Sequence, residues 1–203
     1  MSDGANPPGE RATGLGQPAC GTDRLSPRAR EIVAAARDLL EAEGPAGLSM
    51  RKLAARLGIR APSLYKHFSS KEALEAALIS VGFDEQARLF QAALADSPEP
   101  LVAMAKIYRT YARRNPELYR LIYDRSLNRP LLNPGSEEGA AAPGIQAAGG
   151  DESLARAAWA FAHGMTILEL NDRFTEGADL DVAWRRGITA LQAAAPTRPP
   201  SSG

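Results

Sequence analysis

Residues Leu48 to Leu78 read LSMRKLAARLGIRAPSLYKHFSSKEALEAAL. Ser49 is a typical helix N-cap, and the apolar residues that follow it, Met50, Leu53, Ala54 and Leu57, repeat at helical spacing. Gly58 can adopt the left-handed conformation that a tight turn requires, and Pro62 suits the first turn of a new helix. The stretch therefore predicts two short helices joined by a glycine turn, which is the pattern of a helix-turn-helix.

Helical periodicity continues on both sides of this stretch. Upstream, a helix is predicted from about Pro27 to Glu43, with Ser26 as its N-cap and Gly44 and Pro45 at its end. Downstream, Ser69 and Glu72 form the pattern of a capping box that starts a fourth, longer helix. Further helices are predicted over four segments: about 101–114, from 116 onward, about 151–174 and about 179–194. Alanine replaces the β-branched residues typical of strands, so the sequence predicts an all-α protein.

The two ends and one internal segment differ in composition from the predicted helices. Residues 1–25 are rich in Gly, Pro, Ala and Thr and predict a disordered arm, and residues 196–203 predict a disordered tail. Residues 133–150 are dense in Gly, Pro and Ala, so we expect a long, mobile loop there. Between these segments we expect a three-helix domain with the helix-turn-helix at residues 26–73, followed by a helical bundle at residues 74–195.

The composition narrows the class of protein. The chain has 203 residues, 44% of them hydrophobic, which is typical of a globular protein. No apolar run is long enough to cross a membrane, and residues 1–17 lack the pattern of a secretion signal, so we expect a cytoplasmic location. With one cysteine, Cys20, and two histidines, His67 and His163, the sequence predicts no catalytic residue, no metal ligand and no cofactor, and therefore no enzyme.

The charges balance overall, 24 basic against 24 acidic residues, but they are unevenly distributed. Between Leu48 and Lys71 there is no acidic residue and there are six basic ones: Arg51, Lys52, Arg56, Arg60, Lys66 and Lys71. From Asp84 to the end, 13 basic residues stand against 15 acidic ones. A basic segment beside a near-neutral remainder is typical of a module that binds a polyanion, attached to a domain with another role.

In a helix-turn-helix the second helix lies in the major groove of DNA, and its first residues meet the edges of the bases. Here those positions hold Arg60 and three small residues, Ala61, Pro62 and Ser63, which allow a close approach. Tyr65 and Lys66 follow on the exposed side, where a phenol and an ammonium suit phosphate oxygens. Lys71 adds a positive charge at the start of the next helix. The residues themselves therefore favour binding to double-stranded DNA.

The same stretch resembles the DNA-binding domain of the tetracycline-repressor (TetR) family of transcriptional regulators. The resemblance covers about residues 28–78 and rests on Met-Arg-Lys-Leu-Ala at 50–54, the Gly-Ile turn at 58–59, Leu-Tyr-Lys-His-Phe at 64–68 and the Lys-Glu pair at 71–72. It implies contacts with the DNA backbone from six side chains: Ser49, Arg51, Ser63, Tyr65, His67 and Lys71. It also implies base contacts from residues 60–63 and Lys66, and a core position for Phe68.

The resemblance further implies a homodimer, most often a repressor, that binds palindromic operator DNA and carries a helical C-terminal domain for a small effector and for dimerisation. A weaker resemblance lies in the second half, where YARRNPELYRLIY (111–123) precedes AWAFAHGMTILEL (158–170). These segments are similar to TetR C-terminal domains with a Trp and His-Gly signature, here Trp159, His163 and Gly164. They name no effector. The candidate effector-binding residues are Tyr108, Tyr111, Trp159 and His163.

Several interpretations stay open at this point. His67 is either a buried or capping histidine or a phosphate contact, and for His163 a core or dimer-interface position is favoured over a ligand contact. Gly164 is expected to permit close packing of helices. Two other functions are also considered: a helical enzyme that uses His163 with Glu169 or Asp172, and an interaction protein whose helix-turn-helix no longer binds DNA.

Overall fold

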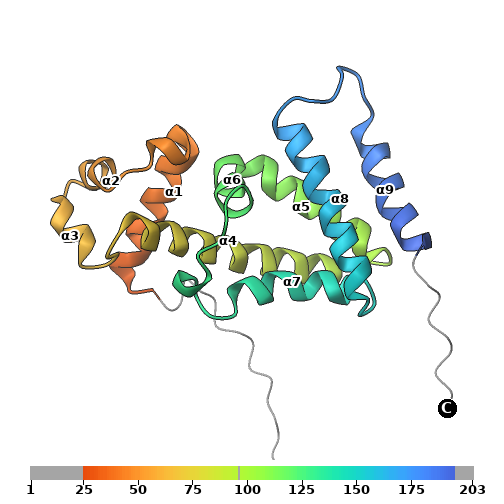
Figure 1. The fold of residues 1–203 in the computed structure, drawn as a ribbon, viewed down its shortest axis with the longest axis horizontal. Coiled ribbons are helices and arrows are strands. Elements are labelled where there is room, and N and C mark those ends of the chain that lie inside the picture. Colours follow the sequence, from red (N-terminus) through yellow and green to blue (C-terminus); the bar gives the residue numbers. More distant parts are fainter. Residues whose placement is uncertain (1–24, 96, 195–203) are drawn as a thin grey trace, which may run out of the picture.

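The structure, a computed structural model, describes residues 25–95 and 97–194, and in this part of the chain it contains helices and no strand. The predicted all-α class is therefore confirmed. The molecule is elongated, with α2 and α3 at one end and α8 and α9 at the other (Figure 1). Residues 1–24 of the predicted arm, Cys20 among them, and the whole predicted tail lie outside the described residues.

The N-terminal half begins with four helices: α1 (Pro27–Gly47), α2 (Met50–Arg56), α3 (Ala61–Tyr65) and α4 (Lys71–Leu94). α1 starts at the predicted cap, where Ser26 Oγ accepts a hydrogen bond from the backbone N–H of Ala29 at 3.2 Å, and its regular geometry breaks at Gly44. The predicted cap of α4 is wrong by one residue. Ser70, which has the extended backbone of an N-cap, accepts from the N–H of Ala73 at 3.1 Å, while Ser69 lies in the preceding turn.

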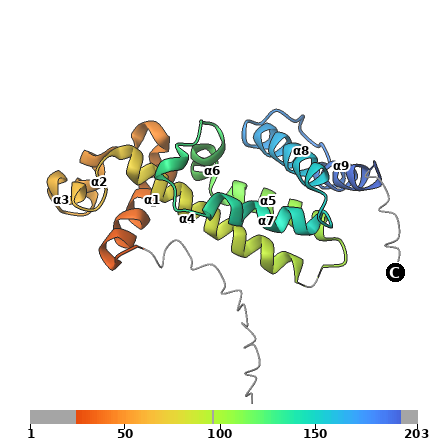
Figure 2. The same ribbon diagram turned by 60° about the horizontal axis from the view of Figure 1, so that its bottom comes forward.

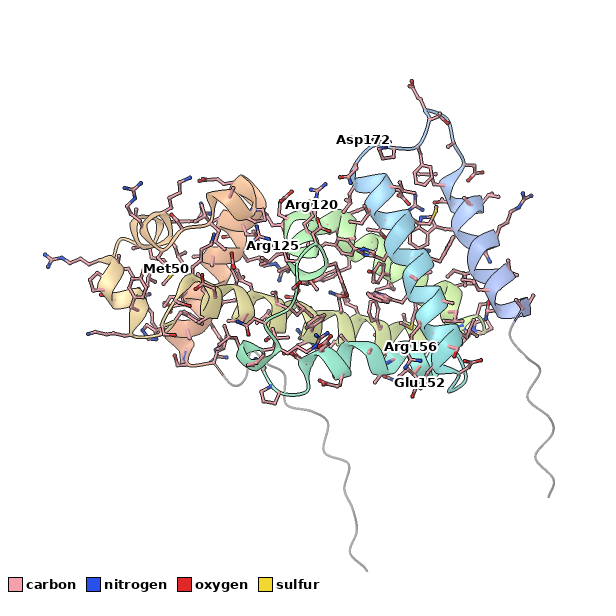
Figure 3. The ribbon with its side chains drawn as sticks, in the orientation of Figure 1. Met50, Arg120, Arg125, Glu152, Arg156 and Asp172 are labelled. Atoms are coloured by element: carbon pink, nitrogen blue, oxygen red, sulfur yellow. The ribbon has the colours of Figure 1, made fainter. Side chains whose placement is uncertain are left out.

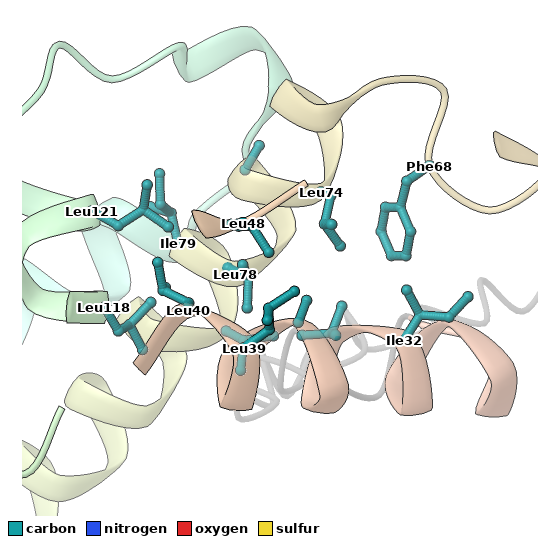
Figure 4. Close-up of a cluster of buried hydrophobic side chains, with 14 of the residues drawn as sticks. Ile32, Leu39, Leu40, Leu48, Phe68, Leu74, Leu78, Ile79, Leu118 and Leu121 are labelled. Carbon is teal, nitrogen blue, oxygen red and sulfur yellow. The ribbon is translucent and has the colours of Figure 1, made fainter. Parts of the chain in front are cut away.

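A buried apolar cluster joins these four helices to α6 (Pro116–Tyr123) (Figure 4). Its members include Ile32, Leu40, Leu53, Leu64, Phe68, Leu74, Leu78, Leu118 and Ile122. Phe68 is buried, as predicted. Burying one such large side chain stabilises the fold by about 1.5 to 3 kcal/mol. Because the fully buried Leu64 anchors α3 from one side, the opposite side of this short helix is left to the solvent.

The C-terminal half consists of α5 (Pro100–Arg114), α6, the short 3-10 turn η2 (Arg129–Leu131), α7 (Ser136–Ala147), α8 (Glu152–Leu170) and α9 (Leu180–Ala194). A second buried cluster gathers residues of α4 to α9, among them Phe90, Tyr108, Tyr119, Trp184 and Ile188. Helices α4 and α6 contribute to both clusters. The domain boundary after residue 73 stays a prediction, because it falls within α4, and α4 contributes to both buried clusters.

The prediction of a long, mobile loop over residues 133–150 is wrong, because most of this segment forms α7, which lies alongside α4 (Figure 2). The backbone N–H of Asn133 donates to Ser80 Oγ of α4 at 2.9 Å and so ties the start of this segment to α4. Pro143 lies inside α7, where it cannot donate a backbone hydrogen bond of the helix, and its side chain is buried. The small side chains of α7 allow close packing on α4, and this packing outweighs the poor helix propensity of its Gly and Pro residues.

Helices α8 and α9 pack against each other at the end of the molecule. α8 ends at Leu170, four residues before the predicted end. The two helices approach closely at Gly187 of α9, where a Cβ atom would lie 2.1 Å from the ring of Phe161. Gly164 does not bring two helices together within one chain, since a Cβ atom there would meet nothing within 4 Å among the described residues.

Candidate nucleic-acid interface and ligand cavity

Helices α2 and α3 form the helix-turn-helix that the sequence predicts. Ser49 caps α2 by accepting a hydrogen bond from the N–H of Lys52 at 3.2 Å, and Gly58 makes the turn with a φ of 64°. α3 follows Arg60, with Ala61, Pro62 and Ser63 in its first turn. Arg60 and Pro62 are exposed and the other two are half-buried. Residues 60–63, which are predicted to face the bases, thus occupy the N-terminal end of α3.

The six basic residues of this region differ in whether an acidic side chain is paired with them. Three of them form ion pairs with acidic residues of α1 and α4: Lys52 with Glu43, Arg56 with Asp38 (3.6 Å) and Lys71 with Glu75 (3.4 Å). Lys71 Nζ also donates to the carbonyl oxygen of Pro45 at 3.3 Å. Arg51, Arg60 and Lys66 are exposed and pair with no acidic residue in the described part of the chain. These three cations therefore carry most of the positive charge that a polyanion would meet.

The end of α3 and the turn after it expose two further predicted contacts. Tyr65 is 50% exposed, which is high for a large aromatic residue, and His67 is also exposed. The structure therefore does not place His67 in the core, and its backbone N–H, rather than its ring, makes the local hydrogen bond to Leu64. Lys66, which lies between them in the sequence, is exposed as well.

A cavity of about 670 Å³ lies in the C-terminal half, enclosed mainly by α4, α5, α6, α7 and α8. Its wall is largely apolar and aromatic and includes Phe83, Phe90, Leu101, Met104, Tyr108, Ile122, Tyr123, Ile145, Trp159, His163 and Ile188. Three of the four predicted effector residues, Tyr108, Trp159 and His163, lie in this wall. The fourth, Tyr111, lies outside it, lining a separate depression where its hydroxyl donates to Glu85 Oε2 at 3.1 Å. That position argues against contact between Tyr111 and a ligand of the cavity.

Two polar residues of the cavity wall, Tyr108 and His163, are linked through Tyr119, which lies behind the wall. The Tyr108 and Tyr119 hydroxyls lie 2.9 Å apart, and the Tyr119 hydroxyl lies 2.7 Å from His163 Nδ1. Burial raises the pKa of Tyr108 well above its usual value and that of Tyr119 to about 12, and burial lowers the pKa of His163. At neutral pH the wall therefore presents uncharged hydrogen-bonding groups.

Charged residues occur only where the cavity reaches the surface. They are Arg125, Arg129, Glu137, Glu152 and Arg156. Figure 3 shows Arg125 beside the end of α6, and Glu152 with Arg156 near the start of α8. Sequence reasoning missed these residues and the phenylalanines of α4, since no local pattern indicates which side chains of five helices will face one cavity.

Helix α6 connects the cavity to α1. Tyr119 and Tyr123 of α6 lie beside the cavity, and the first turn of the same helix is held by Glu41 of α1. The Glu41 carboxylate accepts hydrogen bonds from the backbone N–H groups of Glu117 at 3.2 Å and Leu118 at 3.0 Å. A carboxylate at a helix N-terminus is stabilising because it pairs free N–H groups and interacts favourably with the helix dipole. This link was not predicted from the sequence.

A second link between the two halves centres on Arg37 of α1. Its guanidinium binds Glu85 of α4 at 2.5 Å and the side-chain oxygen of Asn115 at 2.8 Å. These partners are 48 and 78 residues away in the sequence. Together with Glu41, Arg37 ties the helix that supports the helix-turn-helix to α4, to the junction of α5 and α6, and to α6 itself.

The residues proposed for a helical enzyme are not brought together. His163 bonds Tyr119, whereas the Glu169 carboxylate accepts from Arg109 Nε at 2.8 Å and from the indole N–H of Trp184. Asp172 is exposed beyond the end of α8. Within the described residues, no cluster of three or more His, Cys, Asp and Glu side chains is arranged to hold a metal ion. None of the described helices combines the length and apolar character needed to cross a bilayer.

Fold and site together define a helical protein with a helix-turn-helix at one end and a ligand-sized cavity in the other half. Residues 32–78 match the family model for bacterial regulatory proteins of the tetR family, and residues 101–191 match that of the tetracyclin repressor-like C-terminal domain. The chain belongs to the TetR family.

Three known proteins illustrate the relationship. The tetracycline repressor protein class A from transposon 1721 of Escherichia coli is 53% identical over 47 residues, which are 23% of this chain and 22% of that protein. The uncharacterized HTH-type transcriptional regulator YobS of Bacillus subtilis is 32% identical over 103 residues, 47% of this chain and 53% of that protein. The matches thus span about a fifth and about half of these two relatives. The crystal structure of the multidrug binding protein EbrR complexed with imidazole is 28% identical, with a TM-score of 0.63 over 82% of this chain and 90% of that chain.

Proposed function

We propose that this protein is a DNA-binding transcriptional regulator that inserts α3 into the major groove of its operator. The observation that carries the proposal is the charge on either side of α3: Arg60 before the helix and Lys66 after it are exposed cations without an ion-pair partner among the described residues. The base-reading residues are Arg60, Ala61, Pro62, Ser63 and Lys66. The phosphate contacts are Ser49, Arg51, Ser63, Tyr65, His67 and Lys71, with Lys71 the weakest because it is already paired.

The protein acts as a homodimer on palindromic DNA in this proposal. Two recognition helices must then reach half-sites about 34 to 36 Å apart. Leu168 of α8 and Val182 of α9 are exposed apolar residues and support a dimer through these two helices, and the open space at Gly164 leaves room for close approach of a second helix. Single chains would bind one half-site each and lose the benefit of simultaneous engagement.

The cavity in the C-terminal half is the site for a small effector that regulates DNA binding, most simply by releasing a repressor from its operator. The size of the cavity and its mostly apolar wall support this role, as does the bound imidazole named for the related multidrug binding protein. A coupling free energy of about 1 to 3 kcal/mol, or about 5- to 150-fold in affinity, would suffice for a switch. No catalytic step, metal or cofactor is part of the proposal, and a cytoplasmic location stays a prediction.

Footprinting of the purified full-length protein on the DNA upstream of its own gene tests the DNA-binding role. The expected result is a repeatable protected site with two-fold symmetry, bound by a dimer in light scattering. A double variant, Arg60→Ala with Lys66→Ala, is expected to abolish protection while leaving the dimer intact, because both side chains are exposed and α3 lies at the opposite end of the molecule from α8 and α9 (Figure 1). Absence of binding to every duplex at low salt, or a monomeric protein, would overturn the proposal.

A further inference from the structure

The residues that line the cavity indicate the chemistry of its ligand. This inference rests on the proposed function in one respect, that the cavity is the effector site. Its volume of about 670 Å³ falls in the range of pockets that hold drug-sized molecules. Apart from its surface-reaching ends, the wall is built of aromatic and aliphatic side chains. A ligand that fills it must therefore bury a largely apolar body, since each buried polar group without a partner is costly.

One part of the wall suits a planar ring. The rings of Trp159 and His163 stack with their centroids 6.1 Å apart and an interplanar angle of 29°, and the Tyr123 ring lies 5.7 Å from His163 and 6.3 Å from Trp159. Trp159 is 52% exposed although it lines the cavity, so part of its ring is available for contact. Offset or edge-to-face contacts with such rings favour an aromatic group over an aliphatic chain of equal volume.

The charged groups that line the cavity favour an anion over a cation, and the one carboxylate that acts on His163, Asp124, lies outside this lining. Both carboxylates are already paired: Glu137 accepts two bonds from Arg129 at 2.8 Å each, and Glu152 pairs with Arg156 at 2.5 Å. Arg125 lines the cavity, is exposed and pairs with no acidic residue of the described chain. A cationic ligand would find no unpaired carboxylate in the lining, whereas an anionic ligand would find one available guanidinium, which can hold a carboxylate with two hydrogen bonds.

His163 gives the cavity lining a further hydrogen-bond donor. Arg125 follows Tyr123 by two residues, and the Tyr123 ring is the one that lies 5.7 Å from His163. In the tautomer in which Tyr119 donates to Nδ1 of the neutral imidazole, Nε2 carries the ring proton and can donate to a ligand. A carboxylate selects this tautomer because its oxygens can only accept.

We propose that the effector is a largely apolar, ring-containing carboxylate whose charged group binds at the α6 end of the cavity, between Arg125 and His163. The ring lies against Trp159 and Tyr123, and the rest of the body extends along the aliphatic wall toward the start of α8. The two ion pairs at the surface, Arg129 with Glu137 and Arg156 with Glu152, stay intact and need no partner from the ligand.

Calorimetric titration of the full-length protein with three matched probes tests this assignment. The probes are naphthylbutanoate, its primary amide and naphthylbutylamine, which share one apolar body and differ in charge. The acid is expected to bind at least about tenfold more tightly than the amide, since hydrogen bonds to charged groups are the stronger ones. The amine is expected to bind most weakly. Arg125→Gln is expected to lower the affinity for the acid about fivefold or more and to leave the affinity for the amide unchanged.

The matched control is Arg173→Gln, which removes an exposed arginine that does not line the cavity. It should leave all three affinities as they are. Equal binding of acid and amine, tighter binding of the amine, no binding of the acid, or an acid affinity that ignores Arg125→Gln would each overturn the proposal. Because these titrations contain no DNA, such a result leaves the footprint on operator DNA as a separate test of the proposed function.

Discussion

Replacing Glu41 with alanine removes the carboxylate by which α1 holds the first turn of α6. The Glu41 side chain is half-buried and accepts hydrogen bonds from two backbone N–H groups, at 3.2 Å and 3.0 Å, that have no partner within α6. Loss of a capping acceptor costs about 1 kcal/mol, and loss of a negative charge at a helix N-terminus adds about 0.3 to 1 kcal/mol. We therefore expect the free energy of unfolding to fall by about 1 to 2 kcal/mol.

Thermal and urea unfolding of the full-length protein measure this change. For a protein of this size, about 1 kcal/mol corresponds to about 2 to 4 °C in Tm, so the expected decrease is about 2 to 8 °C. Glu41→Gln keeps an acceptor oxygen without the charge and should lose roughly half as much. The matched control is Glu31→Ala, which removes an exposed carboxylate of the same helix that pairs only with Arg28 and should cost about 0.5 kcal/mol or less.

The same variant also tests whether α6 transmits the state of the cavity to the DNA-binding end. If α6 is the connecting element, Glu41→Ala should reduce the effect of a bound ligand on DNA affinity more than it reduces ligand affinity itself. The measurement is the operator dissociation constant with and without saturating ligand. Equal unfolding midpoints for Glu41→Ala and Glu31→Ala would refute the capping argument, and an unchanged ligand effect would refute the role of α6.

The phosphate contacts predict how operator affinity depends on salt: with Arg51 and Lys71 as the cationic phosphate contacts of each subunit in a dimer, the log-log slope of operator affinity against salt should be about −4, from −0.9 per phosphate. Arg51→Ala should make this slope less steep by about 2 in the dimer, and Lys52→Ala should change it less, because Lys52 is paired with Glu43. On a panel of operator variants, Tyr65→Phe should weaken binding to all sequences alike, whereas Lys66→Ala should also change base preference; identical profiles would show that the reading positions are misassigned. Burial lowers the pKa of His163 in the folded protein. As the pH falls below about 6.5, this histidine is therefore protonated in the unfolded chain before it is protonated in the folded protein, and the folded state loses stability. His163→Gln should remove this part of the acid sensitivity in Tm measured against pH, and parallel curves for both proteins would contradict it.

The helix-turn-helix was predictable because its determinants are local. Ser49 caps α2, Gly58 makes the turn and Pro62 opens α3, all within 14 residues. Each of these residues acts on the backbone near it, so their order in the sequence is enough to fix the two helices and the turn. The cap of α4 was harder, since Ser69 and Ser70 are chemically equal and only the backbone geometry of the turn selects Ser70.

The segment of α7 shows where local reasoning fails. Its Gly and Pro content predicts a loop, and the helix forms because small side chains allow packing on α4 and because Ser80 of α4 holds Asn133. Ser80 lies 53 residues upstream of Asn133, and intrinsic propensity contains no information about such distant partners. For the same reason the cavity could be predicted only in part. Trp159 and His163 belong to a segment that resembles TetR C-terminal domains, whereas no sequence pattern marks Arg125 as a residue of the cavity.

The sequence by itself determined that this chain is helical, that one short segment concentrates positive charge, and that this segment has the form of a DNA-binding motif, because caps, turns and periodicity act over a few residues. The tertiary structure decided which of those cations remain available, since Asp38, Glu43 and Glu75 come from neighbouring helices. It also decided which side chains enclose the cavity and that α6 connects it to α1, because contacts between distant segments depend on how whole helices pack.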